Sequence, residues 1–258
     1  MYRRIGVVGW PARIRYSIIA PQCSVAAVGD IMVQTIVARD GGRGLTFFVG
    51  MALAFALAAL VGFAPSYYLK SLYGSPPLPA LVHLHGLVFT AWLVLLIAQT
   101  TLVARGRTDI HSRLGIAGIA LAAVMLALGL MVAVGAAARG FAPPNAPPPL
   151  AFLAIPFFDL VAFAGIVGAG IWQRGTPETH KRLMILSTVA IVDAAVARFP
   201  LPVAMTPPVF FGLTDLFIVA VAVRDLVRDG RLHPATLWGG LWILAGQAIR
   251  LGIMETEP

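Results

Sequence analysis

Three of the five histidines lie in short basic segments, where their imidazoles could ligate a metal. His111 and His180 occupy the same position in segments 105–114 and 174–183, which share the pattern R-G-x-x-[D/E]-x-H-x-R-L. Two neutral imidazoles can ligate the iron of a haem b group or contribute to another metal site. His233, in a third basic segment, could supply a further ligand. We therefore take these histidines as candidate cofactor-binding residues.

The two matching segments also have a purely structural interpretation. Thr108 and Thr176 are residues that cap helix starts, and Pro177 suits a first helical position. Asp109 and Glu178 place negative charge near the positive end of a helix. None of these roles requires the histidines, so the structural and the metal-binding interpretations both stay open.

A second polar pattern runs along the apolar segment that begins near residue 80. His85, Trp92 and Gln99 follow one another at intervals of seven and form a polar stripe on one helix face. Polar groups in lipid normally point into the bundle, so the stripe predicts either interhelical hydrogen bonds or contact with a cofactor or substrate. His85 and His111 fall at opposite ends of a core of about 30 Å and cannot share a ligand.

Ionisable residues interrupt three other apolar segments. Asp159, Asp193 with Arg198, and Asp215 all lie within stretches that are otherwise suited to lipid. An ionisable residue within a membrane span is a candidate for function by default, and we expect Asp193 and Asp215 to lie deepest. The pattern fits a proton relay or ion site, and equally an internal ion pair with Arg198 or Arg250 as the cation.

The composition identifies the element type that must position these residues. The chain has 258 residues, of which 59 % are hydrophobic and 12 % charged, with a formal net charge of +8. These values exclude an ordinary soluble domain and a disordered chain, and they argue against nucleic-acid binding. Cys23 is the single cysteine, so a disulfide within the chain and a cysteine metal cluster are excluded.

We predict an all-α, polytopic membrane helix bundle, because spanning segments in lipid must be helices or closed barrels and these runs are too long for strands. About seven transmembrane helices are expected, near 45–66, 80–103, 113–137, 150–172, 181–199, 207–224 and 235–253. Residues 1–44 form an N-terminal segment, 45–253 the transmembrane domain and 254–258 a C-terminal tail. Residues 1–31 are expected to be an over-extended start or a loosely packed amphipathic segment.

The distribution of Lys and Arg predicts the orientation. Basic residues gather before the first span and in the loops that follow the second, fourth and sixth spans, which places the N-terminus in the cytoplasm and the C-terminus outside. The two motif copies lie 69 residues apart. They predict a tandem repeat of helical hairpins, spans two–three and four–five, related by an axis along the membrane normal.

These residues carry a resemblance to a known group of proteins. Val82 to Gly86 with Trp92 and Gln99, the segments 105–114 and 177–184, and residues 233–240 resemble a group of uncharacterised bacterial multi-pass inner-membrane proteins. The resemblance covers about residues 45–253 and implies a location in the bacterial inner membrane. It brings no activity with it.

Three functions follow as hypotheses. The sequence contains no catalytic triad, zinc-protease helix or phosphate loop, which disfavours an enzyme. The first hypothesis is an assembly or small-molecule-handling membrane protein without its own covalent chemistry. The second is a haem- or metal-binding electron-transfer protein that uses His111 and His180. The third is a proton- or ion-coupled transporter that uses Asp193 and Asp215. Membrane lipids are the expected partners, with protein partners in the membrane possible and the oligomeric state open.

Overall fold

The computed structural model describes residues 46–142 and 148–255. All described residues belong to one compact unit. The predictions for the N-terminal segment 1–44, including the interpretation of residues 1–31, lie outside the described residues and stay predictions.

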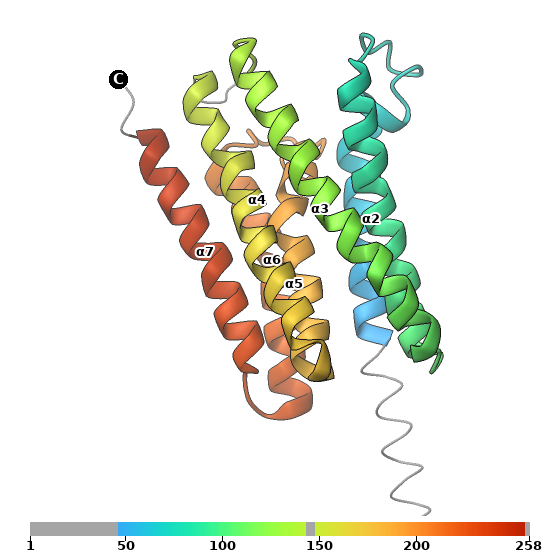
Figure 1. The fold of residues 1–258 in the computed structure, drawn as a ribbon. Helices are drawn as coiled ribbons and strands as arrows, with labels where there is room; N and C mark the ends of the chain where they lie inside the picture. The colour runs from blue at the N-terminus through green and yellow to red at the C-terminus, as the bar shows by residue number, and fades with distance from the viewer. Residues whose placement is uncertain (1–45, 143–147, 256–258) are drawn as a thin grey trace, which may run out of the picture. The chain divides into compact units, whose positions relative to one another are not determined.

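The described residues form seven helices, and the predicted all-helical fold class is confirmed (Figure 1). The first helix is Thr46–Tyr68, and its last five residues, Ala64–Tyr68, form the π-helical turn η1. The others are α2 (Ala80–Ala104), α3 (Thr108–Ala138), α4 (Pro149–Trp172), α5 (Pro177–Val196), α6 (Pro207–Asp229) and α7 (Pro234–Glu255), with the short 3-10 turn η2 (Gln173–Gly175) before α5.

Each predicted span overlaps one helix, although some boundaries differ. The helix predicted at 113–137 begins five residues earlier, at Thr108, and the one predicted at 181–199 runs over Pro177–Val196. The early starts arise because the polar residues of both motif copies continue the helix beyond its apolar part. Both histidines of the motif are therefore helical residues of a first turn.

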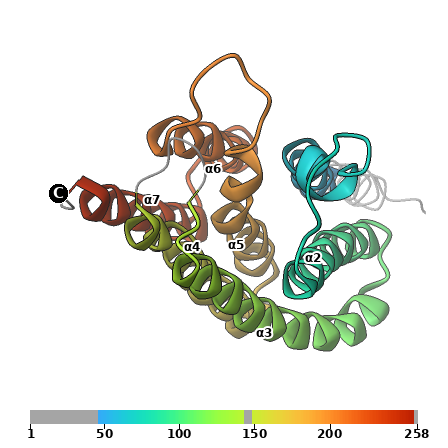
Figure 2. The same cartoon turned by 90° about the horizontal axis from the view of Figure 1, so that it is seen from above.

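Five of the helices are long and apolar enough to cross a membrane, and α5 and α6 are not among them. The reason for α5 is its position, because most of its residues are buried against other helices. Figure 2 shows α5 inside the line that α7, α4 and α3 follow. A helix that is covered by protein does not need an apolar surface on every side.

The first helix packs against α5 and α6 and completes the surroundings of α5. Phe55 of the first helix lies 4.9 Å, between ring centres, from Phe217 of α6. Further along, Gly62 approaches the backbone of Ala195 so closely that a Cβ atom at Gly62 would collide with that carbonyl group. The absence of a side chain therefore sets the distance between these two helices.

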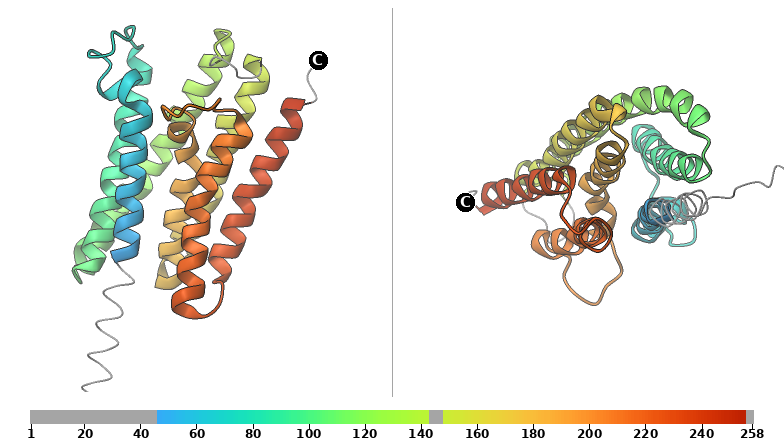
Figure 3. Two further views of the ribbon diagram at one scale, coloured as in Figure 1. Left: turned by 180° about the vertical axis from the view of Figure 1, so that it is seen from behind. Right: turned by 90° about the horizontal axis from the view of Figure 1, so that it is seen from below.

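The loops α2–α3, α4–α5 and α6–α7 lie at one end of the bundle (Figure 3). We call this the basic end, because its loops and the adjoining helix turns carry Arg105, Arg107, Arg113, Arg174, Lys181, Arg182, Arg224, Arg228 and Arg231. The first helix begins at the basic end, and α7 ends at the opposite end. The predicted grouping of basic residues is thus reproduced in the arrangement of the helices.

The outer surfaces of the helices are apolar. Large hydrophobic side chains such as Leu57, Leu87, Ile116, Leu216 and Val227 are at least 60 % exposed. Soluble monomers rarely expose apolar surface on this scale. Together with the five long apolar helices, this surface defines a helical membrane protein in contact with lipid.

Candidate functional site

The two motif histidines meet between α3 and α5. The ring centres of His111 and His180 are 6.1 Å apart, and the ring planes stand at 82°. Each ring comes from the first turn of its helix, at the basic end of the bundle. The prediction that these side chains could meet at the same depth is confirmed, and we call them the histidine pair.

The hydrogen bonds of the histidine pair leave ring nitrogens available. Nδ1 of His180 lies 2.8 Å from the carbonyl oxygen of Gly170 on α4. A carbonyl oxygen only accepts, so Nδ1 donates this hydrogen bond, and in the neutral ring Nε2 is the nitrogen with the lone pair. Nδ1 of His111 is buried and makes no hydrogen bond. The ring of His111 lies beside Gln99 of α2, whose side-chain oxygen is also buried without a hydrogen bond.

Small residues bring α3 close to α2 beside the histidine pair. A Cβ atom at Gly115 would lie 3.7 Å from the side-chain nitrogen of Gln99, and one at Gly118 would lie 3.2 Å from Leu95. Both glycines share a helix face with His111, as their spacing predicts. Close approach of the two helices therefore positions Gln99 next to the pair.

The structure does not bring His233 to the histidine pair. The backbone N–H of Ala235 donates to its Nδ1 over 3.1 Å at the start of α7. Burial and the nearby Arg182 lower the pKa of His233. Across the described ranges, no three His, Cys, Asp or Glu side chains gather closely enough to hold a metal ion. A site that needs a third ligand from His233 therefore has no support in the arrangement.

The structural interpretation of the motif is partly confirmed. Pro177 occupies the first turn of α5, and the acidic residues Asp109 and Glu178 lie in first turns. The capping prediction is wrong for Thr108 and correct in position only for Thr176. Thr108 is the first residue of α3, preceded by Arg107, and Thr176 precedes α5 without a side-chain hydrogen bond to the helix.

The predicted polar stripe of α2 faces the interior. Nε1 of Trp92 donates to Oγ1 of Thr188 on α5 over 3.1 Å, in a fully buried contact. His85 stacks against Phe89 with 4.1 Å between ring centres, and its Nδ1 is buried without a hydrogen bond. Interhelical hydrogen bonding, one of the two predicted roles, thus accounts for Trp92. It does not account for His85 and Gln99, each of which has a buried polar atom without a hydrogen bond.

The intramembrane acids have different surroundings, and two of them, Asp159 and Asp193, are buried together with Arg250. Asp159 on α4 and Asp193 on α5 are 6 % and 2 % exposed, and Arg250 on α7 is 2 % exposed. Nη1 of Arg250 donates to Asp159 and lies 3.6 Å from Oδ2 of Asp193. The predicted pairing of Asp193 with an arginine is therefore confirmed for Arg250.

Asp215 lies several residues inside α6, as expected, but its side chain faces a less covered side of the bundle. It is only partly buried, and Nε2 of Gln247 donates to its Oδ1 over 2.9 Å. Arg198 does not form the predicted ion pair. Its guanidinium donates to the carbonyl of Ala194 and lies 4.8 Å from the ring centre of Phe63. Sequence position alone does not tell which helix face an acid occupies.

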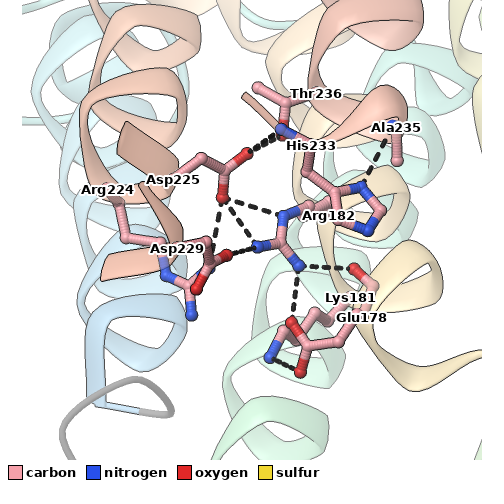
Figure 4. A network of polar contacts seen from close by, with 9 residues as sticks. All are labelled: Glu178, Lys181, Arg182, Arg224, Asp225, Asp229, His233, Ala235 and Thr236. Carbon is pink, nitrogen blue, oxygen red and sulfur yellow. Dashed lines mark hydrogen bonds and ion pairs between the residues drawn. The ribbon is translucent and has the colours of Figure 1, made fainter. Parts of the chain in front are cut away.

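A charged network at the basic end was not predicted. Arg182 of α5 is completely buried, and its Nε and Nη2 donate to Oδ1 of Asp225 on α6 over 2.9 and 2.7 Å. Nη2 also donates to Asp229, and Nη1 donates to Glu178, both over 2.6 Å (Figure 4). The spacing of four between Asp225 and Asp229, which places them on one helix face, was the available signal.

The second oxygen of Asp225 ties α6 to α7. Oγ1 of Thr236 donates to Oδ2 of Asp225 over 2.5 Å, and the backbone N–H of His233 donates to the same oxygen over 3.3 Å. Three basic and three acidic side chains, including Lys181 with Glu178 and Arg224 with both aspartates, take part. The network is balanced in charge, which favours a structural role.

Comparison with known proteins yields no family model, no curated protein and no solved structure that matches the chain. The fold and its apolar surface thus establish the class, a helical membrane protein. The resemblance to bacterial inner-membrane proteins stays an expectation from the sequence.

Proposed function

We propose that the histidine pair ligates a haem iron and that the protein carries electrons in the membrane. The observation that supports this proposal is the approach of His111 and His180 to 6.1 Å at nearly perpendicular orientation. A metal ion held by two imidazole nitrogens at about 2.0–2.1 Å each separates the ring centres by roughly 6 Å, once the size of the rings is added. The observed separation equals that value.

The hydrogen bond of His180 supports the same proposal. A ligating histidine usually donates its other ring N–H to a carbonyl or carboxylate, which fixes the tautomer and the ring orientation. His180 makes this contact with the carbonyl of Gly170 over 2.8 Å. A histidine at a helix start needs no such contact if it only faces water, so the arrangement favours ligation through Nε2.

Haem is favoured over a bare metal ion because the protein offers two ligands. The described residues bring no third His, Cys, Asp or Glu to the pair. A porphyrin would supply the other ligands of its iron, so His111 and His180 would be enough to hold it. The exposed Arg105 and Arg113 lie near the same end and could pair with propionate groups. Haem iron held by two histidines would supply one-electron chemistry, which favours electron transfer.

The proposal is tested by purifying the protein in detergent and recording its absorption spectrum, with and without added hemin. We expect a Soret band, one iron per chain, and a shift of the band on reduction with dithionite. His111→Ala and His180→Ala should each abolish stoichiometric binding. His83→Ala is the matched control, because His83 lies at the opposite end of α2 and is exposed, and it should bind like the wild type.

A colourless preparation that does not bind hemin in stoichiometric amounts would contradict the proposal and leave the two rings as an edge-to-face contact. Equal spectra for the His111→Ala and His83→Ala variants would also contradict it. The hypothesis of an assembly or small-molecule-handling protein without its own chemistry would then be preferred.

We further infer that the basic end faces the cytoplasm of a bacterium, which places the C-terminus outside. The support is the excess of Lys and Arg in the loops of this end, because positive residues are retained on the cytoplasmic side. A C-terminal alkaline phosphatase fusion should be active, and a fusion in the α4–α5 loop should be inactive. The reverse result would invert the orientation.

A further inference from the structure

We propose that Asp159 and Asp193 hold one exchangeable proton between their carboxyl groups, beside Arg250, and so form a proton-binding site within the bundle. This site is separate from the histidine pair and does not depend on haem. It joins α4, α5 and α7 through residues that are at most 6 % exposed.

The contacts of the two carboxyl groups are unequal. Arg250 donates through Nη1 to Oδ1 of Asp159 and also to the carbonyl of Ile155 over 3.1 Å. Asp193 receives no hydrogen bond at either oxygen, although both oxygens are buried, and its nearest cation atom is Nη1 of Arg250 at 3.6 Å. A buried carboxylate without a hydrogen bond is strongly unfavourable. The carboxyl group of Asp193 therefore needs a hydrogen bond that the other side chains do not supply.

A shared proton satisfies Asp193 without any change in the backbone. Nη1 of Arg250 contacts a carboxyl oxygen of each residue, so the two carboxyl groups are neighbours and could form a hydrogen bond with each other. Two carboxylates only accept, so this bond requires that one of them be protonated. Pairs of aspartates that form such a bond share a single proton because two adjacent negative charges repel each other.

The charges around Asp159 and Asp193 also indicate one bound proton. Two carboxylates and one guanidinium in direct contact leave one negative charge in the interior. Asp215 of α6, held by Gln247, and Arg198 of α5 add one charge of each sign and leave that excess unchanged. His85 of α2 faces Arg198 and adds no negative charge. One bound proton makes the whole group neutral.

A metal cation is a poorer occupant than a proton. Hard cations take six or more oxygen ligands. In the described ranges, no third carboxylate or imidazole lies with Asp159 and Asp193 to hold a metal ion. Arg250 also occupies the side of Asp159 that a cation would need. The site therefore selects the smallest cation, which needs two oxygens only.

Infrared spectroscopy of the full-length protein in detergent at neutral pH tests the proposal. A protonated carboxyl group has a C=O band separate from the carboxylate bands, and this band shifts in D2O when its proton exchanges. We expect one such group per chain. Asp159→Asn and Asp193→Asn should each remove the band, because the remaining carboxylate then forms a one-to-one ion pair with Arg250. Asp109→Asn, whose carboxylate on α3 is 60 % exposed and lies outside this group of charges, is the control and should keep it.

Arg250→Gln gives a second test that does not depend on losing a signal. Without the guanidinium both carboxyl groups should be protonated, so the band should approximately double. A wild-type spectrum without a protonated carboxyl band would overturn the proposal. So would a band that appears only after sodium and divalent ions are removed, because that result assigns a metal cation to the site. A band that is lost in Asp215→Asn alone would place the proton elsewhere.

Discussion

Replacing Asp225 with alanine should destabilise the protein strongly, because this carboxylate joins three helices at the basic end. It accepts hydrogen bonds from Nε and Nη2 of the buried Arg182, and also from Arg224, Thr236 and the backbone of His233. The side chains of Arg182 and Asp225 are both completely inaccessible to solvent. Removing the carboxylate thus leaves a buried guanidinium with part of its charge unpaired.

The magnitude follows from what Arg182 retains. Breaking a buried ion pair by removing one partner destabilises a protein by about 3–5 kcal/mol. Arg182 keeps its contacts with Glu178 and Asp229, whose side chains are 55 % and 38 % exposed. Solvent screens such partners, and each contributes only about 0–1 kcal/mol. We therefore expect a loss near the lower limit, about 3 kcal/mol.

The loss is measured by reversible unfolding in mixed detergent and SDS micelles, followed by circular dichroism. The matched control is Asp109→Ala, whose ion pair with Arg107 is about 60 % exposed on both sides and should contribute less than about 0.5 kcal/mol. The double variant Arg182→Met with Asp225→Leu should recover most of the loss, since it removes both charges together. A loss below about 1 kcal/mol in Asp225→Ala, or no recovery in the double variant, would refute the reasoning.

Three further changes have defined outcomes. Trp92→Phe should lower the free energy of unfolding by about 1 kcal/mol through its lost hydrogen bond to α5, and an unchanged unfolding midpoint would argue against that bond. Gly62→Ala should destabilise the protein by about 1–3 kcal/mol, because the added methyl group pushes the first helix away from Ala195. Gly50→Ala is the control and should have no such effect, because the space around Gly50 is open. Equal effects of the two variants in the same unfolding assay would contradict the close approach at Gly62. Because the pKa of His233 is lowered, its contribution to stability is present above the ordinary histidine value of about 6.5 and falls as the pH drops below it. His233→Gln should flatten the dependence of thermal unfolding on pH in that range, and an unchanged slope would speak against it.

The histidine pair could be predicted because its signal is local and repeated. Both copies of the motif place a histidine at the same position of a helix start, so two hairpins of the same orientation bring them to the same level. Gln99 was found through its interval of seven from His85 and Trp92. Register along a helix follows directly from the sequence.

The partners of the buried acids could not be predicted, because they depend on which helices become neighbours. Asp159 and Arg250 are 91 residues apart, and their contact requires α4 and α7 to pack together. Asp215 has a similar sequence context but lies on a less buried face, next to Gln247. The Arg182 network was missed for the same reason, because from the sequence Arg182 is equally consistent with an anchor at the membrane surface and with a buried ion pair.

The central position of α5 has a consequence for how the chain enters the membrane during synthesis. This helix carries its polar residues into the interior and is not apolar enough to cross alone, so we expect it to insert only together with the helices that cover it. Its Asp193 has no cation beside it until Arg250 of α7 is made, later in synthesis. The order of synthesis therefore leaves the buried charge of Asp193 without its cation until α7 is inserted. A chain truncated before α7 should be degraded, which a pulse-chase experiment would measure.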